Sequence, residues 1–167
     1  MELKRCLKSQ LLSARNYSEQ LLKAFDTPQA WVHQVHPHAN HPLWFAGHMG
    51  VSDDFFISLV APDRVKRRPD LVERFGTGSQ PVGDPQAYPP VDDVLAYMRE
   101  RRQTLLDVLE SMSDEDLLVA TPPGTPDFLR DRASVFQTAS WHEGLHSGQV
   151  SVVHRALGHK PVVGQAN

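Results

Sequence analysis

The chain has 167 residues, of which 40% are hydrophobic and 22% are charged, and its net charge is −3 at pH 7. These values are typical of a single globular domain over residues 1–167 with a sizeable apolar core. They exclude the strongly basic surface that nucleic-acid binding requires, and the single cysteine excludes an internal disulfide. No segment resembles a membrane span or a signal peptide, so we expect no membrane association and a cytoplasmic location.

Two helices are predicted in the first half of the chain. Apolar side chains recur at steps of three and four residues over 3–25, which predicts a helix with one buried face, interrupted by Ser18. A second helix is predicted over 42–60, because Pro42 suits a first helical position and a proline follows the segment. His48 lies within its first two turns, on the face that also carries Trp44.

Two more helices are predicted in the second half. The segment 91–112 follows a pair of prolines and carries an apolar stripe with Arg101 in its middle. The segment 131–157 is followed by a glycine, a common C-terminal stop, and its stripe contains two histidines and a glutamine. Because the sequence shows no β alternation of useful length, we predict an all-α fold.

Four amphipathic helices bury their apolar stripes most simply as a four-helix bundle. The connection 61–90 is rich in proline and glycine and far longer than an antiparallel helix hairpin requires. A crossover of this length would make the second and third helices parallel, giving up-down-down-up order. It could also form a lid over one end of the bundle, and the two interpretations are compatible.

Polar side chains interrupt the apolar stripes at similar depths. Ser18, Arg101 and the group on 131–157 lie near mid-length in their helices. Buried polar groups are costly unless they are paired, so such interruptions indicate a shared polar site inside the bundle. The alternative is that Ser18 and Arg101 turn toward the rim, with either Arg101 or its neighbour Arg102 facing solvent.

The histidines indicate where that site lies. His142 and His146 stand four residues apart, which places both imidazoles on one face of a helix. With His48 they would supply three ligands for a divalent transition metal. Glu143 could orient one of these imidazoles, act as a base, or make a surface or interhelix contact. A second group of histidines lies in a loop with irregular spacing: His33, His36, His38 and His41. We expect this loop to be solvated and flexible, with the alternative that one member reaches over the site.

Two motifs resemble the DinB-like superfamily: Pro-Leu-Trp-Phe-Ala-Gly-His-Met at 42–49 and Trp-His-Glu-Gly-Leu-His-Ser-Gly-Gln-Val at 141–150. The resemblance extends over essentially the whole chain. It implies an up-down-down-up bundle that holds zinc or nickel, with iron as a further candidate, through His48, His142 and His146. Asp53 falls where many members carry an acidic residue, usually glutamate. Members frequently form homodimers, and this implies a homodimer here.

The resemblance also implies a chemistry. Characterised relatives handle thiols: mycothiol-dependent maleylpyruvate isomerases, bacillithiol-dependent transferases and the N-terminal domain of ergothioneine-forming sulfoxide synthases. We therefore expect a thiol-dependent transferase or isomerase that acts on a small electrophile, with a low-molecular-weight thiol as cosubstrate. A metal-dependent hydrolase and a non-catalytic metal-binding or stress-response protein are the alternatives. Arg101 and Gln149 are candidate substrate-binding residues from their stripe positions, and no catalytic residue is assigned.

Overall fold

The computed structural model describes residues 2–164. Within them lie seven α-helices and no strand, only an isolated bridge between Ala120 and Asp131, so the predicted all-α class is confirmed. The α-helices are α1 (Glu2–Leu22), α2 (Pro28–Trp31), α3 (Pro42–Val60), α4 (Pro69–Phe75), α5 (Val91–Ser111), α6 (Asp114–Leu117) and α7 (Arg132–Ala156). Three short 3-10 helices cover Pro62–Arg64, Pro85–Ala87 and Asp127–Leu129. Within this part of the chain, every helix is too short or too polar to span a bilayer.

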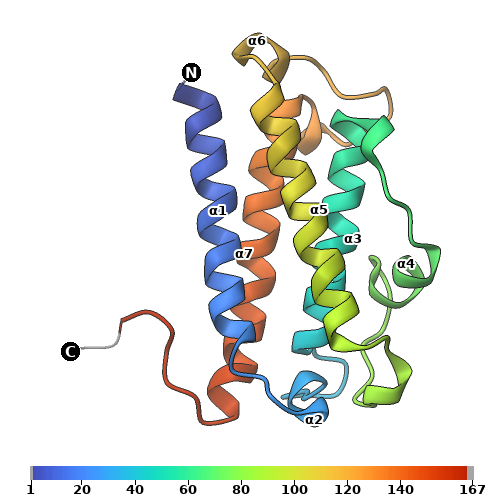
Figure 1. The fold of residues 1–167 in the computed structure, drawn as a ribbon, viewed down its shortest axis with the longest axis vertical. Coiled ribbons are helices and arrows are strands. Elements are labelled where there is room, and N and C mark those ends of the chain that lie inside the picture. The colour runs from blue at the N-terminus through green and yellow to red at the C-terminus, as the bar shows by residue number, and fades with distance from the viewer. Residues whose placement is uncertain (1, 165–167) are drawn as a thin grey trace.

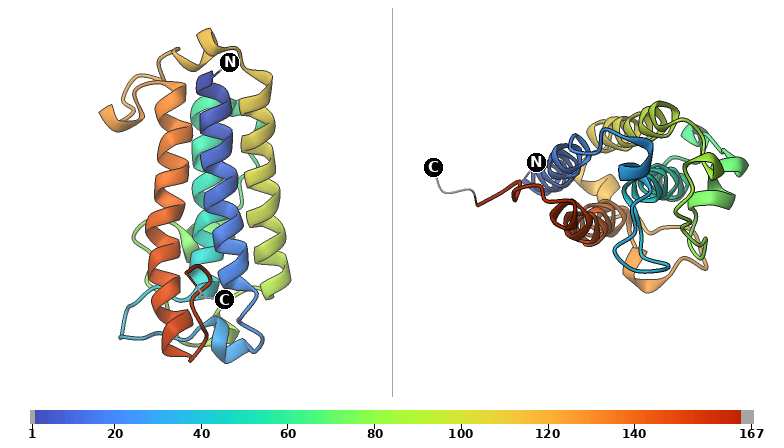
Figure 2. Two further views of the ribbon diagram at one scale, coloured as in Figure 1. Left: turned by 90° about the vertical axis from the view of Figure 1, so that its left-hand side faces the viewer. Right: turned by 90° about the horizontal axis from the view of Figure 1, so that it is seen from below.

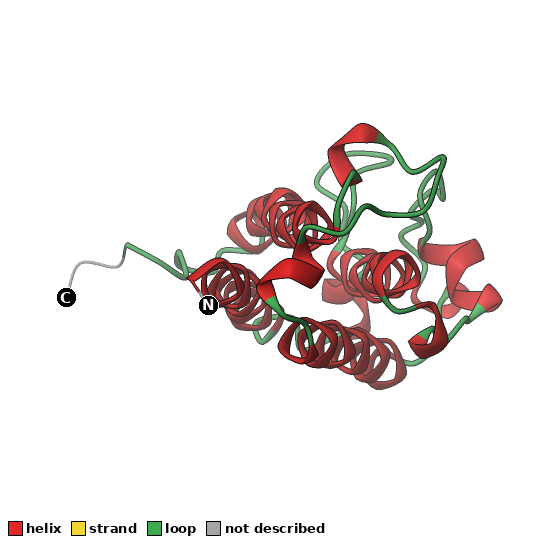
Figure 3. Ribbon diagram, turned by 90° about the horizontal axis from the view of Figure 1, so that it is seen from above, coloured by secondary structure: helices red, strands yellow, loops and turns green. Residues whose placement is uncertain are grey.

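The four long helices lie side by side along the long axis of the molecule (Figures 1 and 2). In Figure 1, α1 and α7 run downward, whereas α3 and α5 run upward. Helix α1 packs on α7, α3 packs on α5, and α3 also contacts α7. The view along the axis in Figure 3 shows the short helices gathered outside and across the ends of these four. The long axis of the molecule is therefore set by α1, α3, α5 and α7.

The segment 61–90 returns the chain from the end of α3 to the start of α5 (Figure 1). It is more ordered than its proline and glycine content suggests, because it contains α4 and two of the 3-10 helices. Helix α4 packs against α3, and its Leu71 and Phe75 are buried there. The segment 61–90 thus runs along the outside of α3 and packs against it through α4.

The helix ends follow their sequence signals. The predicted range 42–60 is identical to α3, and the other three long helices begin and end within three residues of their predicted bounds. Asp131 caps α7, because its carboxylate accepts a hydrogen bond from the backbone N–H of Ser134 while the Ser134 hydroxyl accepts from the Asp131 N–H. Gly158 follows α7 with φ of +87°, a conformation that favours glycine.

One histidine of the expected flexible loop is part of the fold instead. His41 is 0% exposed and caps α3, since its Nδ1 accepts a hydrogen bond from the backbone N–H of Trp44 at 3.0 Å. Its Nε2 lies 3.1 Å from the Tyr88 hydroxyl, and burial lowers the pKa of His41 to about 4. The prediction of a solvated side chain was wrong for His41. His36 and His38 are exposed, as expected.

The core is divided in two by a polar layer at mid-height. One apolar cluster includes Leu21, Met49 and Val150, and the other includes Leu11, Ile57 and Phe136. Between them each long helix places a buried charged residue. These residues are Arg15 of α1, Asp53 of α3, Arg102 of α5 and Glu143 of α7.

Gly47 of α3 packs directly against the ring of Phe75 of α4. A Cβ at this position would overlap the ring of the buried Phe75. We expect Gly47→Ala to lower the free energy of unfolding by about 1–3 kcal/mol, because an overpacked core must shift. Gly144→Ala is the matched control, since a Cβ on this exposed position of α7 meets nothing within 4 Å and should stabilise the helix by about 0.5–1 kcal/mol. Urea unfolding measures both values, and equal stabilities would contradict the close packing.

Candidate metal centre

Three histidines from two helices meet beside the polar layer. His48 of α3 and His142 and His146 of α7 each present a ring nitrogen, and these atoms lie within 4.8 Å of one another. The Nε2 atoms of His48 and His142 are 3.2 Å apart. The four-residue spacing on α7 and the contact between α3 and α7 create this convergence. The structure thus brings together the three residues that the sequence selects.

The spacing of the nitrogens fits a small divalent metal. Zinc–imidazole bonds of about 2.0–2.1 Å in tetrahedral geometry separate two ligand nitrogens by about 3.3–3.4 Å. The observed 3.2 Å between His48 Nε2 and His142 Nε2 is close to that value. Two unprotonated nitrogens at this distance repel one another unless a cation or a proton lies between them. The distance is therefore compatible with a shared metal ion, and in the metal-free protein it is that of a hydrogen bond between the two rings.

Hydrogen bonds fix the protons of two of the three imidazoles. His48 Nδ1 lies 2.7 Å from the Phe75 carbonyl oxygen, which can only accept, so Nδ1 carries the proton and Nε2 keeps its lone pair. His146 Nδ1 likewise donates to Gln149 Oε1 at 2.9 Å. Asn40 Nδ2 donates to the same oxygen at 2.8 Å and holds the amide in place. Such bonds are typical of imidazoles that bind metal through the opposite nitrogen.

The environment keeps the three rings neutral. Burial lowers the pKa of His48 to about 4. Burial, followed by the neighbouring His146, lowers the pKa of His142 to about 3. The pKa of His146 is also lowered by burial. Metal binding requires the unprotonated imidazole, so all three are available as ligands at neutral pH.

These shifts predict how the stability of the metal-free protein depends on pH. The folded-state pKa of His48 lies below its ordinary value of 6.5, so the unfolded chain takes up a proton first as the pH falls. The contribution of the neutral His48 to the free energy of unfolding is therefore fully present above pH 6.5 and is lost between pH 6.5 and about 4. At about 1.4 kcal/mol for each pH unit of difference, His48 alone contributes on the order of 3 kcal/mol. Urea unfolding with a chelator at several pH values should show this loss, and a smaller one in His48→Gln. Equal losses in the two proteins would contradict it.

Gln149 is expected to act on the metal through His146. Gln149→Leu keeps the size of the side chain but removes the acceptor for His146 Nδ1, which frees the ring to rotate and to change tautomer. We expect about a tenfold loss of metal affinity, measured by competition with a chromophoric chelator. Gln103→Leu is the control, because the Gln103 amide donates to the exposed Asp107 on α5 and lies outside the histidine cluster. Unchanged affinity in Gln149→Leu would show that this hydrogen bond does not orient the ligand.

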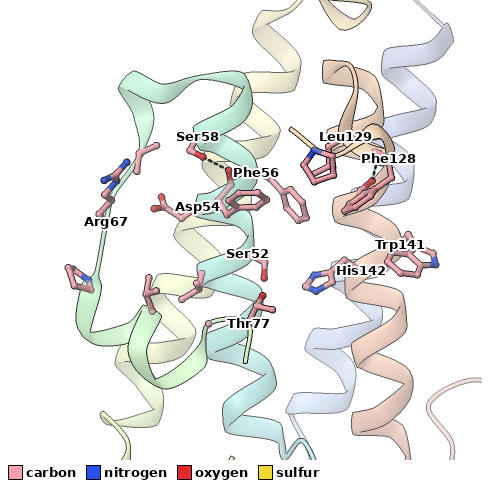
Figure 4. Close-up of a pocket in the computed structure, with 18 residues that line it drawn as sticks. Ser52, Asp54, Phe56, Ser58, Arg67, Thr77, Phe128, Leu129, Trp141 and His142 are labelled. Atoms are coloured by element: carbon pink, nitrogen blue, oxygen red, sulfur yellow. Dashed lines mark hydrogen bonds between the residues drawn. The ribbon is translucent and has the colours of Figure 1, made fainter. Parts of the chain in front are cut away.

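A cleft of about 690 Å³ opens beside His142 (Figure 4). Residues from α3, α4, α7 and the segments that follow α3 and precede α7 line it. Most of the lining is apolar, and Figure 4 shows Ser52, Thr77 and His142 close together in one part of it. A substrate in this cleft would therefore reach the metal centre past His142.

The two candidate substrate-binding residues lie outside the lining of this cleft. Arg101 is buried and donates to Asp54 Oδ1 at 3.1 Å and to the Arg64 carbonyl oxygen at 3.0 Å. Arg102 is buried as well, so the alternative in which one of these neighbours faces solvent does not hold. Gln149 is exposed on the other side of His146, next to Asn40.

The four charged residues of the polar layer form a charge cluster of buried ion pairs, which contains none of the three histidines. Arg15 Nε lies 2.7 Å from Glu143 Oε1, and Arg102 Nη2 lies 2.8 Å from Glu143 Oε2. Both arginines also reach Asp53, Arg102 through two atoms at 2.9 Å each. Burial by itself raises the pKa of Glu143, but Arg102 and Arg15 more than offset this and hold the pKa below its usual range. Glu143 therefore makes an interhelix contact and does not orient a metal ligand.

Two members of this cluster have roles that the sequence left open. Arg15 was not selected as a candidate, although it lies four residues after Leu11 and three before Ser18 on the buried stripe of α1. Its place on the buried stripe was the sequence signal that could have identified Arg15. Asp53 bridges Arg15 and Arg102 and so belongs to the charge cluster. Ser18 is buried and donates to the Ala14 carbonyl oxygen of its own helix.

One comparison with known proteins gives a match. A family model described as the DinB superfamily matches residues 10–150. This range enters all four long helices and contains the three histidines and the four residues of the charge cluster. A search of curated proteins finds no match.

Proposed function

The chain belongs to the DinB superfamily, and from this premise we propose that it is a metal-dependent enzyme built on an up-down-down-up four-helix bundle. His48, His142 and His146 would hold zinc or nickel, with iron as a further candidate. The reaction we propose is a thiol-dependent transfer to, or isomerisation of, a small electrophile. We also propose that the protein acts as a homodimer, as many members of the superfamily do.

The observation that carries this proposal is a three-histidine cluster with an open side next to a cleft. Among residues 2–164, the group of side chains close enough to hold a metal contains these three histidines and no fourth ligand. Structural zinc sites are usually closed by four protein ligands, whereas catalytic sites keep a position for substrate. The cleft that reaches His142 supplies the space for that substrate.

The chemistry follows from the charge of the site. A divalent metal held by three neutral imidazoles keeps its full charge and lowers the pKa of a thiol or water that it binds. The Phe75 carbonyl and Gln149 hold the protons on the outer nitrogens of His48 and His146, so those rings stay oriented. The hydroxyls of Ser52 and Thr77 line the cleft near His142 and supply hydrogen bonds to a bound electrophile. The apolar side chains that line most of the cleft would contact the body of the electrophile.

The choice of a thiol as cosubstrate is supported by the family and not by a residue of the cleft. The same three ligands would serve a hydrolase, with water in place of the thiol. An experiment that detects the thiol at the metal therefore separates the two enzymes.

Cobalt substitution provides that experiment. The cobalt-loaded protein is titrated with cysteine and, as the matched control, with serine. If a thiol binds the metal, cysteine produces a sulfur-to-cobalt charge-transfer band in the near ultraviolet and serine does not. The absence of the band with cysteine, mercaptoethanol and glutathione would contradict the thiol-dependent reaction. Hydrolysis of an activated ester by the same sample would then favour the hydrolase.

A further inference from the structure

The cleft beside the metal centre has an exposed apolar rim. Phe55, Val72, Phe128 and Trp141 line it and are 49%, 51%, 64% and 63% exposed. Single exposed apolar residues are common on protein surfaces, but a contiguous group around a cavity marks a binding site. The volume of about 690 Å³ lies within the range of small-molecule sites, about 300–1,000 Å³. The cleft therefore suits a ligand with an apolar body.

The cations that follow α3 are paired, with one exception. Lys66 Nζ lies 2.7 Å from Glu100, and Arg68 Nη2 lies 2.5 Å from Asp70. The guanidinium of Arg67 makes no ion pair or hydrogen bond with the residues that the structure describes, and it lines the cleft. An anionic group of a ligand in the cleft could form an ion pair with Arg67, as Glu100 does with Lys66 and Asp70 with Arg68.

The acidic residue of the cleft does not cancel this charge. Asp54 is 7% exposed and its Oδ1 accepts hydrogen bonds from Arg101 Nη1 at 3.1 Å and from the Lys66 backbone N–H at 2.8 Å. The buried Arg101 thus neutralises the Asp54 carboxylate from behind. The charge that remains at this end of the cleft is the positive charge of Arg67.

Arg67 and the metal centre lie on opposite sides of the cleft. Figure 4 shows Arg67 on the connection after α3, whereas His142 projects from α7 on the opposite side of the opening. We propose that the cleft selects an amphipathic small molecule whose anionic group, a carboxylate or sulfonate, binds Arg67 while its apolar body lies against the aromatic rim. This inference rests on the proposed function, in which the other end of the same molecule would reach the metal past His142.

Two fluorescent probes that differ by one charged group test the proposal. Anilinonaphthalene sulfonate carries the apolar body and the anion, and N-phenylnaphthylamine carries the apolar body alone. We expect both to bind the metal-free and metal-loaded protein, and Arg67→Met to weaken the sulfonate by about fivefold while leaving the uncharged probe unchanged. Arg68→Met is the matched control, because it removes an adjacent cation that is paired with Asp70 and does not line the cleft.

Several outcomes would overturn the proposal. One is unchanged sulfonate binding in Arg67→Met, and another is an equal loss in Arg68→Met or for the uncharged probe. A third outcome depends on protein concentration: neither probe binds the wild type where sedimentation shows a dimer, but both bind after dilution to monomers. In that case the apolar rim would be an interface between copies of this chain. The metal content of each sample is measured separately. A protein that takes up no metal when metal is added, but still prefers the sulfonate through Arg67, would contradict the proposed enzyme and leave the anion site standing.

Discussion

Replacing Glu143 with leucine is expected to lower the free energy of unfolding by about 3–5 kcal/mol. Glu143 is 0% exposed and pairs with Arg15 at 2.7 Å and Arg102 at 2.8 Å. The four charged residues of the polar layer, two arginines and two acids, are balanced in the wild type. Without Glu143 the layer keeps one excess positive charge in a place where water cannot reach it.

Urea unfolding followed by circular dichroism measures this loss. Glu19→Gln is the matched control, because Glu19 bonds to Arg99 at 2.8 Å on the exposed side of α1. Partly exposed pairs contribute about 0–1 kcal/mol, so the control should change little. If Glu143→Leu lowered the free energy of unfolding no more than Glu19→Gln, the buried ion pairs would not stabilise the packing of the four long helices.

Loss of metal binding is the second large expected effect. In the wild type, zinc at about one hundred times its dissociation constant should stabilise the fold by about 2.7 kcal/mol and raise the melting temperature accordingly. His142→Ala and His146→Ala should each abolish this stabilisation while leaving a helical protein. Each variant keeps only two of the three converging imidazoles.

The loop histidines provide the controls for this experiment. His36→Ala and His38→Ala remove exposed imidazoles outside the cluster, so both variants should respond to zinc as the wild type does. Stabilisation by zinc that persisted in His142→Ala and His146→Ala but disappeared in His36→Ala would show that the loop binds the metal instead.

The long helices and the three-histidine cluster could be predicted because their signals are local. Apolar spacing, prolines and capping residues determine where α3 and α7 begin and end. The four-residue interval between His142 and His146 fixes their relation on one helix whatever the tertiary structure is. Only the approach of His48 from another helix had to be inferred from burial.

The charge cluster and the cleft could not be predicted, because both depend on how the helices are rotated and paired. The sequence identifies Ser18 and Arg101 as polar positions but not their partners. Only the packed structure shows that one side of α7 carries the metal-site histidines and another side carries Glu143. Arg102 and Arg15 bury their charges because partners from other helices meet them there. The cleft depends on segments 61–90 and 118–131, whose paths no periodic pattern encodes.

The most direct test of the metal centre is elemental analysis of the purified, untagged wild type beside His142→Ala. We predict about one zinc, nickel or iron per chain in the wild type and none in the variant. A wild type that contains no metal and takes up none when it is added would contradict the account. Equal metal content in the two proteins would contradict it as well.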